Sequence, residues 1–299
     1  MSNCDFLIID TYNMIVRAKT PWTRVVDANL ILLSFLRIFR KCLDDFQPTK
    51  VIMPFDDYIG NSFRRTLVPE YKIHRRARNE ADPFNDSFKK QKEIILSMIE
   101  HVFPVYSLKY KGYEADDLIA MICKIASDNV NIVVWSNDND LIQIQQKMPN
   151  VRIWSPQRKD FMPNPEYDYV TYKSLVGKNN EMPGVKGIGK KTAERAMRSQ
   201  FEFIKTIASQ PQRYLEYRTN KKIVDLLENE LTIPDNMHHI LTKKVRYDPA
   251  NFERTIKENA FDEIARNIQS YHHLFFNIQM KNNKSERDWF FNRKESAHA

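Results

Sequence analysis

Short apolar runs that alternate with longer helical patterns constrain the fold of this chain more than any other feature. The runs lie at residues 6–9, 51–55 and 132–135, and each contains β-branched side chains. Runs of this kind are typical of strands that are buried on both faces of a parallel sheet. Helical patterns at residues 28–46 and 89–102 separate them. The alternation predicts an α/β fold in which a mostly parallel central sheet is flanked by helices.

Aspartates follow these apolar runs. Asp10 follows the first run and Asp56 the second, and Asp138 and Asp140 come shortly after the third. The carboxyl ends of parallel strands share one edge of a sheet, and ligands of such folds bind there. A single aspartate at a strand end is usually a turn or cap residue, whereas several at one edge form an acidic cluster.

A further acidic group follows an extended stretch at residues 102–108 and consists of Glu114, Asp116 and Asp117. Taken alone, it is typical of the first turn of a helix, where the helix dipole favours negative charge. Together with the strand-end aspartates it would place seven carboxylates at one edge, and these would repel one another without cations between them. Hard oxygen ligands with no His or Cys among them favour Mg²⁺ or Mn²⁺. The sequence therefore predicts a divalent-metal site.

The chain is basic, with 46 Lys and Arg residues against 38 Asp and Glu, and a formal net charge of +8. This balance favours a polyanionic partner. Basic residues concentrate at residues 63–92, soon after Asp56, with aromatic residues among them. A solvated loop accounts for such a segment equally well in isolation. Its place beside the predicted metal site favours a role in holding a nucleic-acid strand over the metals.

The string GVKGIGKKTA, from Gly184 to Ala193, places three glycines ahead of a predicted helix. Glycines permit a close approach of the backbone, and free N–H groups at a helix N-terminus bind phosphate. A lone Gly-x-Gly is often only a turn. The full string, with its lysines and a helical segment at residues 170–176 before it, resembles a helix-hairpin-helix, which grips phosphates without reading sequence.

Other features exclude several classes of protein. Three widely spaced cysteines with no C-x-x-C pair indicate neither a zinc site nor a disulfide framework. No apolar run approaches the roughly 18 residues of a membrane span, and the N-terminal stretch MSNCDFLIID lacks the features of a secretory signal. We therefore expect no membrane partner and a cytoplasmic location.

The motifs occur together, and in a fixed order, in one family. The stretches LIIDTYNMIVRA, FDDYIGNSFRRTLVPEYKIHR, YEADDLIA, SNDNDLIQI and GVKGIGKKTA span residues 6 to about 200. This series resembles the 5′-nuclease (flap endonuclease) superfamily, which includes the 5′-nuclease domain of bacterial DNA polymerase I and the bacteriophage 5′-exonuclease/RNase H enzymes. The resemblance implies a PIN-like α/β nuclease core at residues 1–169, with a basic helical arch at about 57–92. It also implies a helical DNA-binding region at residues 170–299, with a helix-three-turn-helix and a basic tail.

The resemblance assigns roles to individual residues. The implied metal ligands are Asp10, Asp56, Glu114, Asp116, Asp117, Asp138 and Asp140. The implied catalytic residues are Lys72, which assists cleavage in the family, together with Asp116 and Arg64. Arg64, Lys72 and Arg75 match the F-R…Y-K-x-x-R pattern at the base of the arch. The implied DNA contacts are Arg65, Arg75, Arg76, Gly184, Lys186, Gly187, Gly189, Lys190, Lys191 and Thr192, and a K⁺ ion is expected at the hairpin.

The implied activity is hydrolysis of phosphodiesters to a 5′-phosphate and a 3′-hydroxyl, dependent on Mg²⁺ or Mn²⁺. The implied substrates are branched or 5′-ended duplex DNA and RNA–DNA hybrids, as in the removal of primers and flaps during replication or repair. Metals would activate a water and stabilise the departing 3′-oxygen. We expect a monomer. The low Gly content and the many Asn, Lys and Ile residues suggest an AT-rich source, such as a bacteriophage acting in its host's cytoplasm.

One stretch departs from the family pattern. Where the family has G-D-x-S-D-N-I-P-G ahead of the hairpin, this chain has VGKNNEMPG, so that the two aspartates fall on Gly177 and Asn180. Neither residue is an anionic ligand, and the sequence leaves open whether Glu181, one place along, compensates. We therefore expect one strong metal site and a weaker second site that favours Mn²⁺.

Two other functions stay open. A branched-DNA-binding protein on a nuclease scaffold, with weak or no cleavage, would fit the missing aspartates. A metal-dependent phosphatase or PIN-type ribonuclease would fit the acidic edge but not the hairpin or the basic arch. The basic C-terminal segment NKSERDWFFNRKESAHA is predicted to expose Trp289, Phe290 and Phe291. These aromatics either pack back onto the domain or dock a replication protein.

Overall fold

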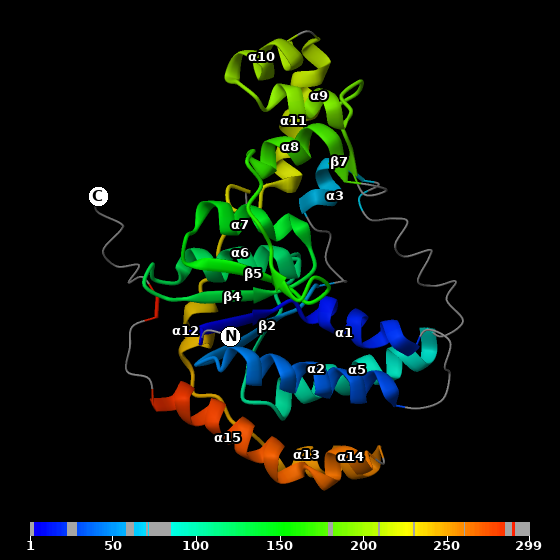
Figure 1. Cartoon of the computed structure of the whole chain (residues 1–299), viewed down its shortest axis with the longest axis vertical. Helices are drawn as coiled ribbons and strands as arrows, with labels where there is room; N and C mark the ends of the chain where they lie inside the picture. Colours follow the sequence, from blue (N-terminus) through cyan, green and yellow to red (C-terminus); the bar gives the residue numbers. More distant parts are fainter. Residues whose placement is uncertain are drawn as a thin grey trace.

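The computed structural model describes residues 3–22, 29–57, 63–69, 71, 85–178, 182–208, 210–229, 231–259, 261–284 and 289–290. Its central sheet has six strands in the order β3-β2-β1-β4-β5-β6 (Figure 1). All neighbouring strands of this sheet are parallel except β5 and β6. The strands are β1 (Phe6–Ile9), β2 (Lys50–Pro54), β3 (Tyr106–Leu108), β4 (Ile132–Trp135), β5 (Val151–Ser155) and β6 (Asp160–Phe161). The predicted mostly parallel sheet is confirmed.

The sheet is buried on both faces, and successive side chains of each strand enter different cores. Leu7 and Ile9 pack among the side chains of one core, whereas Phe6 and Ile8 pack in the other. This is the period of two that a pleated strand imposes. It explains why the strands read as continuous apolar runs rather than as alternating patterns.

Helices cover both faces, as Figure 1 shows. One face carries α1 (Thr11–Lys19), α2 (Leu30–Phe46) and α5 (Asn85–His101). The other carries α6 (Ala115–Ile125) and α7 (Ile142–Lys147). The short helices η1 (Thr20–Trp22), α3 (Phe63–Leu67) and η2 (Asn139–Leu141) lie in the connections.

A group of helices rises above the carboxyl edge of the sheet in Figure 1. It comprises α8 (Tyr169–Val176), α9 (Lys190–Ala196), α10 (Gln200–Ala208) and α11 (Pro211–Val224), with the two-stranded ribbon of β7 (Gly177–Lys178) and β8 (Met182–Pro183). These helices have a small core of their own, which includes Leu175, Ile188 and Ile207. We call them the hairpin helices.

The last helices return to the α/β core. They are α12 (Met237–Thr242), α13 (Pro249–Glu258), α14 (Asp262–Arg266) and α15 (Ile268–Lys284). Phe275 of α15 packs against Phe39 of α2, with ring centroids 6.0 Å apart. The division of the chain at residues 169 and 170 stays a prediction. The structure adds that buried side chains of α12, α13, α14 and α15 belong to the two cores that flank the sheet.

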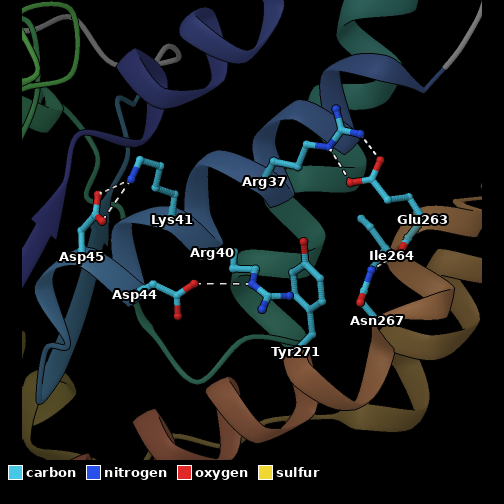
Figure 2. Close-up of a pocket in the computed structure, with 9 residues that line it drawn as sticks. All are labelled: Arg37, Arg40, Lys41, Asp44, Asp45, Glu263, Ile264, Asn267 and Tyr271. Atoms are coloured by element: carbon cyan, nitrogen blue, oxygen red, sulfur yellow. Dashed lines mark hydrogen bonds and ion pairs between the residues drawn. The ribbon is translucent and has the colours of Figure 1, made fainter.

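Figure 2 shows the groove where α2 meets α14 and α15. The cations of α2 in this groove are already paired: Arg37 with Glu263, Arg40 with Asp44, and Lys41 with Asp45. Arg40 also lies over the Tyr271 ring, 4.6 Å from its centroid. Exposed pairs of this kind contribute little to stability, because water screens their charges. The groove therefore helps to attach the C-terminal helices and offers no concentrated charge to a ligand.

The C-terminal aromatics Trp289 and Phe290 pack onto the domain. Trp289 is 7% exposed and Phe290 2% exposed. Both rings pack on Phe6 of β1, and Phe290 forms an antiparallel bridge with Ala126. Of the two alternatives for these aromatics, packing back onto the domain is the one found for Trp289 and Phe290, because the Phe6 ring offers them an apolar surface. Phe291 lies outside the described residues. Among the helices of the described ranges, none is both long and apolar enough to cross a membrane.

Candidate active site

Asp10 lies at the centre of the acidic edge. Residue Ile9 of β1 pairs with Trp135 of β4, so Asp10 and Ser136 leave adjacent parallel strands together. The Ser136 hydroxyl donates to Asp10 Oδ2 at 2.8 Å. The backbone N–H of Asn13 donates to Asp10 Oδ1 at 3.0 Å. Burial raises the pKa of Asp10 to about 6 against the effect of these two hydrogen bonds, and the charges of Asp138 and Asp56 add to the rise. The ends of β1, β2 and β4 thus place Asp10, Asp56 and Asp138 close enough for their charges to interact.

Asp56 connects this edge to α6. Its Oδ1 accepts the backbone N–H of Ala115, the first residue of α6, at 2.7 Å. The carboxylate of Asp56 therefore lies at the positive end of this helix, next to Glu114 and Asp116. Lys92 of α5 also lies in the field of Asp56, which opposes the lowering of the Lys92 pKa by burial.

The acidic residues at the start of α6 divide between the edge and the interior. Glu114 and Asp116 are half-buried, whereas Asp117 is completely buried. Asp117 forms a bidentate ion pair with Arg64, with Nη1–Oδ2 and Nη2–Oδ1 distances of 2.8 and 2.7 Å. This placement differs from the expected ligand role of Asp117, because the adjacent positions 116 and 117 are rotated by about 100° around the helix.

Arg64 also differs from its expected role. Its side chain is 2% exposed, and besides Asp117 it donates to Glu114 Oε2 at 3.3 Å and to the Ile223 carbonyl at 2.9 Å. A guanidinium enclosed in this way cannot touch a substrate phosphate in this arrangement. Arg65, its neighbour on α3, is exposed. Lys72, Arg75 and Arg76 lie outside the described residues.

Asp138 and Asp140 form the other side of the edge. Asp138 Oδ1 accepts the Asp140 amide at 2.9 Å. Asp140 Oδ1 accepts the Tyr169 hydroxyl at 2.9 Å and lies 3.9 Å from Lys173 Nζ. Sequence reasoning missed Lys173. The only signal for it is the four-residue spacing from Tyr169, which places both side chains on one face of α8.

Gly177 stands where the family pattern has an aspartate, and its backbone leaves no room for a side chain. This residue has φ +78°, and a Cβ there would lie 2.4 Å from the Gly184 nitrogen and 2.6 Å from the Met182 carbonyl oxygen. No aspartate can occupy position 177 with this backbone. Asn180 and Glu181 lie outside the described residues. The depleted second metal site stays a prediction.

The edge is an open array of carboxylates. Within the described residues, no three Asp, Glu, His or Cys side chains are grouped closely enough to enclose a metal ion. Mg²⁺ does not require such a cage, because it keeps several waters and binds through one or two carboxylates. Burial is the main cause of the raised pKa of Asp10, and the charges of Asp138 and Asp56 add a smaller part. The donor set therefore fits a hydrated hard cation.

The glycine-rich loop is braced from α11. Lys186 N–H donates to Glu216 Oε2 at 2.8 Å, and Arg213 Nε donates to the Lys186 carbonyl at 3.2 Å. Gly187 has φ +78°, and a Cβ there would lie 2.9 Å from Arg213 Nη2. A Cβ at Gly189 would meet nothing within 4 Å. The other predicted DNA contacts divide between exposed lysines, Lys186, Lys190 and Lys191, and the half-buried Gly184 and Thr192.

Comparison with known proteins gives a consistent result. The family model "5′-3′ exonuclease, N-terminal resolvase-like domain" matches residues 5–175. The flap endonuclease Xni of Vibrio cholerae is 26% identical over 71% of this chain and 83% of its own. A 5′-3′ exonuclease of Mycoplasmopsis pulmonis is 28% identical over 79% of this chain and 80% of its own. The DNA polymerase I of Caldicellulosiruptor bescii is 26% identical, but the match spans only 24% of that protein.

Solved structures agree on the fold. T5 5′-exonuclease with bound zinc has a TM-score of 0.61 at 19% identity, over 76% of this chain and 90% of that chain. Human GEN1 in complex with Holliday junction DNA has a TM-score of 0.51 at 14% identity, over 86% of this chain and 68% of that chain. The family match covers more than half of the chain and all the strand-end carboxylates. The chain therefore belongs to the family of 5′-3′ exonucleases that share the N-terminal resolvase-like domain.

Proposed function

We propose that this chain is a divalent-metal-dependent, structure-specific 5′ nuclease that acts as a 5′-3′ exonuclease and flap endonuclease. Its substrates would be branched or 5′-ended duplex DNA and RNA–DNA hybrids. The observation that carries the proposal is the position of Asp10, Asp56 and Asp138, which follow β1, β2 and β4, three adjacent strands of the sheet. Family membership supplies the reaction class, and the basic net charge of +8 suits a polyanionic substrate.

Mg²⁺ or Mn²⁺ would be held by Asp10, Asp56, Glu114 and Asp116. A bound metal would supply activation of water and neutralisation of charge on the cleaved phosphate. The chain's own groups orient these ligands. Asp10 is fixed by Asn13 and Ser136, and the amide of Ala115 fixes Asp56. Such preorganisation lowers the cost of assembling the site when substrate arrives.

A second metal would have weaker support. Asp138 and Asp140 would be its ligands, but Gly177 supplies no carboxylate and Lys173 Nζ lies 3.9 Å from Asp140 Oδ1. The ammonium group lowers the local demand for a cation. We propose that Lys173 supplies part of the positive charge that a second metal would otherwise provide.

The hairpin helices would grip the duplex, and the basic arch would hold the single-stranded 5′ end. The exposed lysines Lys186, Lys190 and Lys191 lie around the glycine-rich loop and would contact phosphates without reading sequence. Lys72 would assist cleavage, with Arg65, Arg75 and Arg76 as DNA contacts. A K⁺ ion at the hairpin stays a prediction. Arg213 already engages one carbonyl of the loop, that of Lys186.

Cleavage of a labelled 5′-flap duplex in Mg²⁺ or Mn²⁺ tests the function directly. Wild type is expected to release the flap with a 3′-hydroxyl. Asp116→Asn is expected to abolish cleavage and keep DNA affinity within a few-fold, because the change removes a ligand charge and no phosphate contact. Asp44→Asn, a surface aspartate on α2, is the matched control and should cleave normally.

Flap binding without cleavage at any metal concentration would contradict the proposal. That result would favour the alternative of a branched-DNA-binding protein on a nuclease scaffold. Normal turnover by Asp116→Asn would remove this residue from the metal site.

Lys173→Met tests the second half of the site. We expect single-turnover cleavage at low Mg²⁺ to fall about 10- to 100-fold, since a fixed charge near the reacting phosphate is lost. High Mn²⁺ should restore part of the rate by filling the vacated position. The control is Lys147→Met, a lysine that lies 4.0 Å from Asp168 at the start of α8. Unchanged rates at every metal concentration would show that Lys173 only pairs with Asp140.

Valine substitutions in the glycine-rich loop test whether it contacts phosphates. Gly189→Val is a better test than Gly187→Val. Gly187 has a positive φ and faces Arg213, so a valine there would distort the loop itself. At Gly189 the backbone is extended, with φ −90°, and the Cβ position is open. We expect Gly189→Val to keep its melting temperature within a few degrees and to weaken binding to all duplex sequences roughly 10-fold. Full affinity, or a sequence-dependent loss, would refute the hairpin assignment.

A further inference from the structure

Arg64 and Asp117 form an enclosed ion pair between segments that are far apart in the sequence. Arg64 is 2% exposed and Asp117 is 0% exposed. The fork of the guanidinium meets both carboxylate oxygens at 2.8 and 2.7 Å. A bidentate pair of this kind fixes orientation as well as distance. It attaches α3, at the base of the basic arch, to the first turn of α6.

The donors around Asp117 leave no oxygen lone pair for a metal. Oδ2 accepts Arg64 Nη1 and the Glu114 amide, the latter at 3.1 Å. Oδ1 accepts Arg64 Nη2 and Asn229 Nδ2, the latter at 3.3 Å. A carboxylate offers about four lone-pair positions, and each oxygen here has two donors. Asp117 is thus saturated by protein groups.

The same ion pair is connected to the hairpin helices by a contact of Arg64 with α11. Arg64 Nε donates to the Ile223 carbonyl at 2.9 Å, next to the last residue of α11. Near its other end, α11 holds the glycine-rich loop through Arg213 and Glu216. The helix has 14 residues, or roughly 20 Å of rigid rod. One straight element therefore spans from the proposed phosphate grip to the buried pair.

Packing around Tyr71 strengthens this junction. Tyr71 is 5% exposed and packs with Ile223 of α11 and Met182 of β8. Its hydroxyl lies 3.4 Å from Glu114 Oε2, the carboxylate oxygen that Arg64 also contacts. Two residues at the base of the arch thus converge on one candidate metal ligand.

We infer that Arg64 and Asp117 are positioning residues that set the distance between the duplex grip and the metal edge, and so determine which phosphodiester is cut. The inference rests on the proposed nuclease function and assigns Asp117 no metal. Arg64 acts through Glu114, Asp117 and the end of α11 and does not touch the substrate. A buried pair of this geometry adds little net stability compared with apolar side chains of similar volume, so its removal can be tested in a folded protein.

The double variant Arg64→Met/Asp117→Leu tests the inference on a 5′-flap duplex labelled at one end. We expect Mn²⁺ affinity, measured by calorimetry without DNA, to stay within about three-fold, because no ligand is lost. Duplex affinity should also stay within about three-fold. Single-turnover cleavage should fall about 10- to 100-fold, since small displacements of the reacting groups cost that much. We expect wild type to cut at one phosphodiester and the double variant to cut at the neighbouring ones as well.

Arg64→Lys provides a second variant in case the double variant does not fold. Lysine keeps the charge but cannot meet both oxygens of Asp117 and the Ile223 carbonyl together, so a smaller rate loss with the same spreading is expected. Arg37→Met, at the exposed pair with Glu263, is the matched control and should cut like wild type.

Three results would overturn the inference. A loss of Mn²⁺ affinity of tenfold or more in the double variant would make Asp117 a metal ligand. A single, unshifted cut at the wild-type rate would make the pair merely structural, as would a slower cut that stays at one phosphodiester. If wild type itself cuts no flap, the proposed function fails first, and that outcome is separate from these.

Discussion

Repulsion among carboxylates at one edge of a parallel sheet is the constraint on which the rest of this structure depends. The pairing of Ile9 with Trp135 delivers Asp10 and Ser136 side by side, and the charges of Asp56 and Asp138 reach the same point. The sheet cannot move these groups apart, so their charge must be balanced by cations or by hydrogen-bond donors. Two backbone amides and one serine hydroxyl donate hydrogen bonds to Asp10 and Asp56 and supply part of this balance.

Basic side chains from separate elements supply another part. Arg64 of α3 enters the interior to meet Asp117, and Lys173 of α8 lies beside Asp140. These cations come from α3 and from the hairpin helices. The acidic residues therefore also hold α3 and α8 in place. A hydrated divalent metal held by Asp10, Asp56, Glu114 and Asp116 would supply the rest of the positive charge.

Much of this could be predicted from the sequence because it follows from local patterns. Continuous apolar runs predict buried parallel strands, and the residues just after them must share an edge. The division between Asp116 and Asp117 could not be predicted, because it depends on the rotation of α6 and on Arg64, which is 53 residues away. Gly177 could be recognised as a missing aspartate, but its positive φ and crowded Cβ position depend on the β7–β8 ribbon. The burial of Trp289 and Phe290 depends on Phe6 of β1, at the opposite end of the sequence.

Anomalous scattering from crystals soaked in Mn²⁺ tests the central claim most directly, because it locates the cation on the acidic edge. The account predicts one strong peak coordinated by the strand-end carboxylates with Glu114 and Asp116, and a weak peak or none beside Asp138 and Asp140. Asp117 should still be paired with Arg64 in the metal-bound crystal. A Mn²⁺ ion coordinated by Asp117 with Arg64 displaced, two equally strong peaks, or no peak at this edge would contradict the account.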